Sequence, residues 1–163
     1  MNLSLRPRSL EPERPSVAMQ EAALERAMEA ARDPLGSLDP EPWTYYRLDE
    51  ETVSAVVWLY ARLLEEEMGP EGARAAYGQW RAIPGWVVVT CARIDDEAKM
   101  ERAVEDCLTS VQRATLSLWS DNVPNNWVTD MITEHPELYA LVGVDAAEEK
   151  VLGIVWFGHP EQG

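Results

Sequence analysis

Residues 85–92, GWVVVTCA, form a near-continuous apolar run that begins directly after Pro84. A strand with one face in water alternates apolar and polar residues, so a run without alternation is typical of a strand that is covered on both faces. We therefore place residues 85–92 at the centre of a sheet. Any fold for this chain has to cover both faces of that sheet.

The rest of the chain supplies candidates for the covering layers. Apolar residues at helical spacing predict helices, and shorter apolar or aromatic runs predict two further strands. The helices are expected at residues 16–32, 50–68, 71–80, 95–119 and 136–142, and the strands at residues 44–48 and 151–158. This order predicts an α+β sandwich, in which helices cover a small, mainly antiparallel sheet.

The length of 163 residues, 46% of them hydrophobic, suits one domain with a continuous core and is too short for two ordinary ones. We expect a single domain over residues 1–163. Residues 1–16 combine prolines with charges and show no period, so we expect an extended N-terminal arm there.

The longest predicted helix has an unusual apolar pattern. One face repeats at alternating spacings of three and four residues, through Met100, Val104, Cys107, Val111, Ala114 and Leu118. From residue 107 to residue 119 the other faces also become apolar, with few charges beyond Arg113. A helix that is apolar almost all round is buried, so we expect burial inside the domain or across an oligomer interface.

Charge excludes two classes of partner. The formal net charge is −15, from 29 acidic and 14 basic residues, so nucleic acid and anionic membrane surfaces are repelled over most of the surface. The apolar runs are too short to cross a bilayer, and the sequence predicts a cytoplasmic protein. Arg6, Arg8 and Arg14 cluster in the N-terminal arm, which is the first place to look for a bound anion.

Several familiar sites lack their signatures. No Gly-x-Gly-x-x-Gly follows a strand, no phosphate loop ends in Gly-Lys-Ser/Thr, and no metal-ligand spacing occurs. His135 and His159 are far apart, each precedes a proline, and a surface or capping role is the stronger reading for both. Cys91 and Cys107 fall on inward positions and are expected to be reduced core thiols.

Two segments do attract attention. Residues 120–130, SDNVPNNWVTD, follow the long helix, and a turn that only reversed the chain would have no need of Trp127. Asp39 and Glu41 lie in a proline-rich loop before Trp43, although loop carboxylates are more often exposed than functional. Seven tryptophans are many for this length, which favours an interface or a flat cofactor.

The order of these segments resembles the nitroreductase family of FMN-dependent oxidoreductases. ALERAMEAARDPLGSLDPEPWTYYRL is similar to the family's first helix, its Pro/Ser/Gly/Asn loop and the Gln-Pro-Trp that opens a strand. WVVVTC resembles the central strand, VQRATLSLW the buried helix of the dimer interface, and NVPNNWVTD the segment beside the isoalloxazine ring. HPELYALVGVDAAEEKVLGIVWFGHPE follows the family's usual ending.

The resemblance implies a homodimer with two FMN sites at the subunit interface. It implies ping-pong hydride transfer from NADH or NADPH, through FMN, to a nitroaromatic, quinone or enone. The family's phosphate-binding Arg-Arg-Ser maps onto Pro7, Arg8 and Ser9, with Arg6 nearby. The ring segment maps onto Pro124, Asn125, Asn126 and Trp127, with the N–H groups of both asparagines expected to be available, while Ser37, Asp39 and Glu41 map onto the loop near the ring.

Departures from the family pattern support an alternative. Pro7 and Glu11 replace arginines, Asp39 and Glu41 replace an Asn and a Gln, and the basic tail is missing. Because a charge-assisted hydrogen bond contributes about 1.5–3 kcal/mol, two lost arginines predict FMN affinity weaker by roughly two to four decades. The alternative is a degenerate nitroreductase-fold protein that has lost flavin and acts as a binding or assembly partner.

Overall fold

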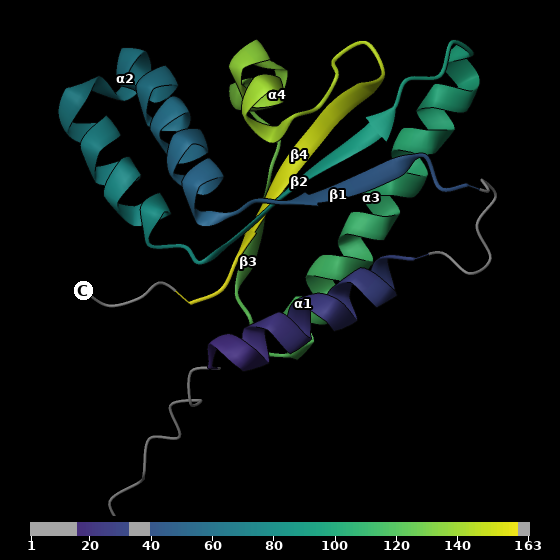
Figure 1. Ribbon diagram of the computed structural model, residues 1–163, viewed down its shortest axis with the longest axis horizontal. Coiled ribbons are helices and arrows are strands. Elements are labelled where there is room, and N and C mark those ends of the chain that lie inside the picture. The colour runs from purple at the N-terminus through teal and green to yellow at the C-terminus, as the bar shows by residue number, and fades with distance from the viewer. Residues whose placement is uncertain (1–15, 33–39, 160–163) are drawn as a thin grey trace, which may run out of the picture.

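The computed structural model describes residues 16–32 and 40–159. Within these residues, four antiparallel strands form one sheet in the order β1-β2-β4-β3 (Figure 1). The strands are β1 Trp43–Arg47, β2 Gly85–Ala92, β3 Asn125–Val128 and β4 Glu149–Phe157. The predicted position of residues 85–92 inside the sheet is confirmed, since β2 pairs with β1 on one side and with β4 on the other.

Helices cover both faces of the sheet, as the apolar β2 requires. Helices α1 Val17–Ala31 and α3 Glu97–Ser120 pack on one face, and α2 Glu50–Arg81 and α4 Pro136–Val142 pack on the other (Figure 1). Alternation along β2 sends Val87 and Val89 into the first layer and Trp86 and Val88 into the second. The predicted α+β sandwich is therefore confirmed.

Helix α2 is a hairpin of two helical halves. Gly69, at φ 73° and ψ 171°, interrupts it, and Pro70 follows, so the first half ends where Gly-Pro predicted. The ring of Tyr60 in the first half stacks on Trp80 in the second, with centroids 4.3 Å apart. This contact joins the two halves, which leave and rejoin the sheet at the same end.

Helix α3 is buried on one face only. Its inner face, which includes Cys107, Val111, Ala114 and Leu118, packs against α1 and the sheet. On its outer face Leu116 is 67% and Trp119 is 58% exposed. The burial predicted for all sides of this helix is thus not achieved within one chain.

Both cysteines are free and buried, as the sequence predicts. Burial raises the pKa of Cys107 to about 12 and also raises that of Cys91, where the charge of Glu149 adds to the effect. Both thiols therefore stay protonated near neutral pH and behave as apolar core groups.

Candidate functional site

The segment that follows α3 makes a tight turn into an edge strand. Asp121 N–H bonds to the carbonyls of Ser117 and Leu118, and Asn122 adopts a left-handed φ of 58°, which asparagine tolerates better than most residues. Val123 is fully buried and anchors the turn to the core. The chain then enters β3, so residues that read as a turn in the sequence form a strand.

Trp127 is held by a glycine on the neighbouring strand. A Cβ atom on Gly153 would lie 2.7 Å from the carbonyl oxygen of Val128 and closer still to two carbons of the Trp127 indole ring. The indole therefore lies directly over the Gly153 backbone and packs against the α1/α3 core. The tryptophan in this segment anchors β3 to β4.

Backbone groups of β3 divide into two sets. The N–H of Gly158 donates to Pro124 O at 2.9 Å, which makes residues 124 and 158 a hydrogen-bonded pair of the antiparallel ladder. Such pairs alternate with pairs whose backbone groups point away, so Asn126 bonds toward β4, whereas Asn125 and Trp127 present their N–H groups at the free sheet edge. Of the two asparagine N–H groups expected to be available, the ladder leaves that of Asn125.

The side chain of Asn125 is held in place by two hydrogen bonds to backbone carbonyls. Its Nδ2 donates to the carbonyls of Thr115 and Val123, each at 3.2 Å. These bonds tie the start of β3 to the last turns of α3. The N–H of Asn125 at the sheet edge is therefore carried on a braced backbone.

A hollow of about 280 Å³ opens at this corner of the sheet. Three of the predicted site residues, Pro124, Asn125 and Asn126, come together in it. The remaining lining residues are Ile83, Trp156, Phe157 and Gly158. We call this the β3 hollow.

Glu41 lies at the opposite end of the sheet. Ala92 N donates to Pro42 O at 2.7 Å, which fixes the approach to β1 beside the end of β2, whereas Asn125 aligns through Phe157 with Gly85 at the beginning of β2. At 3.3 Å per residue, these points are roughly 20 Å apart along the sheet. Within one chain, Glu41 and the β3 hollow are therefore far apart.

Helix α1 runs between these two ends. His159 N–H donates to Gln20 Oε1 at 3.3 Å near the beginning of α1, while Ser110 Oγ donates to Ala31 O at 2.7 Å near its end. The beginning of α1 therefore lies on the side of the β3 hollow, and α1 ends on the side of Glu41. Five predicted site residues lie outside the described residues: Arg6, Arg8, Ser9, Ser37 and Asp39.

Around Glu41 the structure holds a buried hydroxyl pair. Tyr45 Oη and Ser110 Oγ are 2.7 Å apart, and burial raises the pKa of Tyr45, with the nearby Cys107 and Glu41 adding to the increase. This phenol is protonated at neutral pH and links β1 to α3. Because Ser110 also bonds Ala31, the pair is a structural junction between three elements.

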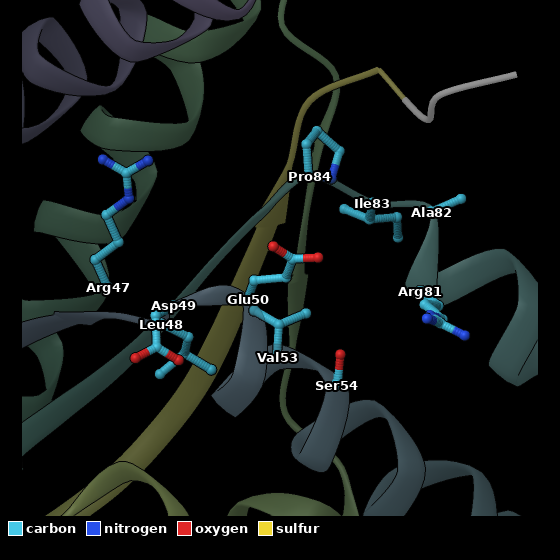
Figure 2. Close-up of a pocket in the computed structure, with 10 residues that line it drawn as sticks. All are labelled: Arg47, Leu48, Asp49, Glu50, Val53, Ser54, Arg81, Ala82, Ile83 and Pro84. Atoms are coloured by element: carbon cyan, nitrogen blue, oxygen red, sulfur yellow. The ribbon is translucent and has the colours of Figure 1, made fainter.

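A larger hollow of about 660 Å³ lies where β1 leads into α2 and α2 returns to β2, and no pattern in the sequence predicted it. In Figure 2 Arg47 extends away from the other lining residues, consistent with its ion pair with Glu21 on α1, and Glu50 extends toward Ile83 and Pro84. Asp49 accepts from Thr52 N at 2.8 Å as the cap of α2, and this bond lowers the Asp49 pKa. Arg47 is paired with Glu21, and the carboxylates of Asp49 and Glu50 offset the charge of the second lining arginine, Arg81, so this hollow is a poor phosphate site.

Two absences among the described residues bear on function. None of their helices is both long and apolar enough to span a bilayer. Over the same ranges, no three His, Cys, Asp or Glu side chains gather in a way that could hold a metal ion.

No protein-family model matches the sequence, and no curated protein matches it. Solved structures do match. A nitroreductase-like family protein from Bacillus cereus superposes with a TM-score of 0.69 at 13% identity, over 93% of this chain and 78% of that one. An FMN-dependent nitroreductase from Clostridium difficile gives 0.62 at 14%, over 88% and 78%.

An NADPH:FMN oxidoreductase from Vibrio harveyi, solved with NAD+, gives a TM-score of 0.57 at 13% identity, over 91% of this chain and 62% of that one. These structural similarities extend over most of the described sheet and helices. Because the sequence identities are low, they support a shared fold only. The chain has the nitroreductase-like fold.

Proposed function

We propose that this protein is an FMN-dependent NAD(P)H oxidoreductase that reduces nitroaromatic, quinone or enone compounds by ping-pong hydride transfer. The observation that carries the proposal is the β3 hollow, which Pro124, Asn125 and Trp156 line beside the free sheet edge that carries the braced Asn125 N–H. The nitroreductase-like fold and the use of FMN by proteins of similar structure support it. The protein would act in the cytoplasm on small molecules.

The residues of the hollow match the ring of FMN in their chemical character. An edge N–H without a ladder partner suits a ring nitrogen that changes charge, and the apolar lining of Ile83 and Phe157 suits a flat aromatic body. When bound, FMN would supply the hydride acceptance and donation. The phosphate assignment to Arg6, Arg8 and Ser9 stays a prediction, since those residues lie outside the described ranges.

We further propose that the working unit is a homodimer. Leu116 and Trp119 on the outer face of α3 and Val17 and Met19 at the beginning of α1 are large apolar side chains that stay more than half exposed in one chain. Burying such side chains contributes about 1.5–3 kcal/mol each. A second copy packed on this surface would also bring its own Glu41 end toward the β3 hollow, joining the two halves of a site that one chain separates.

A flavin-free binding or assembly protein is the second candidate. Its support is the carboxylate of Glu41, half-buried before β1 beside the predicted ring loop, in a chain of net charge −15. An anionic cofactor is disfavoured by carboxylates near it. This candidate keeps the dimer and removes the redox chemistry.

FMN titration of the purified protein separates the two. The oxidoreductase proposal expects quenching of flavin fluorescence with a Kd in the micromolar range, and NADPH should then bleach the bound flavin. A colourless protein that leaves flavin fluorescence unchanged at high micromolar FMN rules the proposal out in favour of the second candidate.

Asn125→Pro tests the assigned N–H directly. Proline removes a donor that the ladder does not use, and prolines are tolerated on edge strands, so β3 should persist. Losing one such bond predicts FMN binding weaker by about tenfold. Asn125→Ala is the matched control, because it removes the same side chain and keeps the N–H; equal FMN affinity in both variants contradicts the assignment.

A further inference from the structure

Aromatic rings form a continuous row that starts at the β3 hollow. Trp156 lines the hollow, and its ring centroid lies 5.9 Å from that of Trp80. Trp80 in turn stacks on Tyr60, with centroids 4.3 Å apart and planes 10° from parallel. The three rings come from β4 and from both halves of the α2 hairpin, so the row exists only in the folded chain.

The row ends on a proton acceptor. The buried hydroxyl of Tyr60 donates a hydrogen bond to the carboxylate of Asp130, which precedes the 3-10 helix Met131–Glu134. Partial burial of the carboxylate beside Tyr60 raises the pKa of Asp130, which makes this carboxylate a stronger base than an ordinary one. Asp130 is itself an exposed residue, so a proton that it accepts can pass to water.

These contacts provide each component of a radical pathway. Tryptophan and tyrosine are the aromatic side chains that lose one electron most readily, and rings in van der Waals contact exchange electrons rapidly. A tyrosine that loses an electron also loses its phenolic proton, and a bonded carboxylate at the hydroxyl lets both leave together. The neighbouring Trp86 packs edge-on to Trp156 at 5.2 Å but donates its N–H to the backbone carbonyl of Ile83.

We propose that Trp156, Trp80, Tyr60 and Asp130 form an oxidation relay that carries an oxidising equivalent from the β3 hollow to the buried Tyr60, whose proton passes to Asp130 at the surface. The oxidant is an oxyl radical, RO•, that enters the hollow from solution. An electron moves from Trp156 to RO•, which takes up a proton from water and becomes ROH. Trp80 then reduces Trp156 and Tyr60 reduces Trp80, while the Tyr60 proton goes to Asp130, so the balance is RO• plus tyrosine giving ROH plus tyrosyl radical.

The relay protects the hollow, because the radical leaves Trp156 before the indole is hydroxylated. It needs no flavin, so its failure and the failure of the proposed oxidoreductase activity are independent. A test therefore has to deliver the oxidant at Trp156 in the full-length protein.

A photochemical probe can do this at position 126. Asn126 is exposed and lies opposite Trp156 in the strand register, whereas Cys91 and Cys107 are fully buried. The variant Asn126→Cys is labelled with a thiol-reactive ruthenium polypyridyl complex. A laser flash in the presence of a sacrificial electron acceptor then converts the label into a one-electron oxidant beside Trp156. Transient absorption then follows the tryptophanyl and tyrosyl radicals separately.

We expect a tryptophanyl signal that decays into a tyrosyl signal. Tyr60→Phe should abolish the tyrosyl signal, while Tyr77→Phe, which alters a half-buried tyrosine of α2 outside the row, should leave it unchanged. Asp130→Asn keeps the shape and an acceptor oxygen but removes the base, so tyrosyl formation should slow by about tenfold or more, a factor that corresponds to roughly 1.4 kcal/mol in the barrier.

Each opposite result overturns the relay. It is wrong if the labelled protein gives a lasting tryptophanyl radical without tyrosyl, or if Tyr60→Phe retains the tyrosyl signal. Should Tyr60→Phe fail to fold, Asp130→Asn decides alone, because its exposed side chain is replaced by an isostere; an unchanged rate of tyrosyl formation would then refute the proton transfer.

Discussion

Replacing Gly153 by alanine should release β3 from the sheet. The new Cβ would meet the Val128 carbonyl oxygen at 2.7 Å and the Trp127 indole even closer, and backbone and ring cannot both yield without separating β3 from β4. Overpacking by one methyl group costs about 1–3 kcal/mol, and the backbone contact places this site at the upper end, about 3 kcal/mol. For a chain of this length that is a fall in Tm of roughly 6–12 °C.

Thermal and urea unfolding followed by circular dichroism measure this loss. Gly78→Ala is the matched control, since no atom lies within 4 Å of its added Cβ and the helical position predicts a gain of about 1 kcal/mol. Combining Gly153→Ala with Trp127→Leu should recover about 1 kcal/mol through their coupling. A Gly153→Ala protein within about 0.5 kcal/mol of the parent would refute the packing that anchors β3.

The free energy of unfolding should fall as pH rises above about 10, the ordinary pKa of tyrosine. In the folded state burial raises the pKa of Tyr45, and the hydrogen bond to Glu149 raises that of Tyr46. Above this pH the folded protein holds phenolic protons that the unfolded chain releases. Tyr45→Phe should therefore reduce the loss of stability at alkaline pH, as measured by urea unfolding. A pH profile identical to that of the parent would contradict this prediction. The double variant Leu116→Ser/Trp119→Ser should be monomeric by light scattering, since removing these two apolar side chains from each subunit weakens association by roughly four decades. Trp58→Ser, at a tryptophan that is 55% exposed on the α2 side, should leave the dimer intact, and a parent protein that is monomeric at micromolar concentration contradicts the interface.

Local patterns predicted most of the elements correctly. The apolar run at residues 85–92 fixed the inner strand, and Gly69-Pro70 located the break in α2, because both depend on backbone preferences that neighbouring residues decide. Residues 125–128 were missed as a strand, since their asparagines favour a turn and only pairing with β4 makes them extended. The aromatic row was beyond prediction, because Tyr60, Trp80 and Trp156 meet through tertiary packing.

Sheet register also changes how the predicted site has to be understood. The family resemblance implied that Glu41 and Asn125 would face one ligand at a subunit interface, and the register through β2 and β4 puts them at opposite ends of one chain. A common site for both therefore requires a second copy, and the exposed outer face of α3 supplies an apolar surface for it. Flavin binding then depends on dimerisation, but dimerisation does not depend on flavin. A monomeric α3 variant should therefore lose FMN affinity, whereas a flavin-free protein can still dimerise. A monomer that bound FMN as tightly as the parent would show that the β3 hollow suffices without the Glu41 end, and would remove the reason for joining the two.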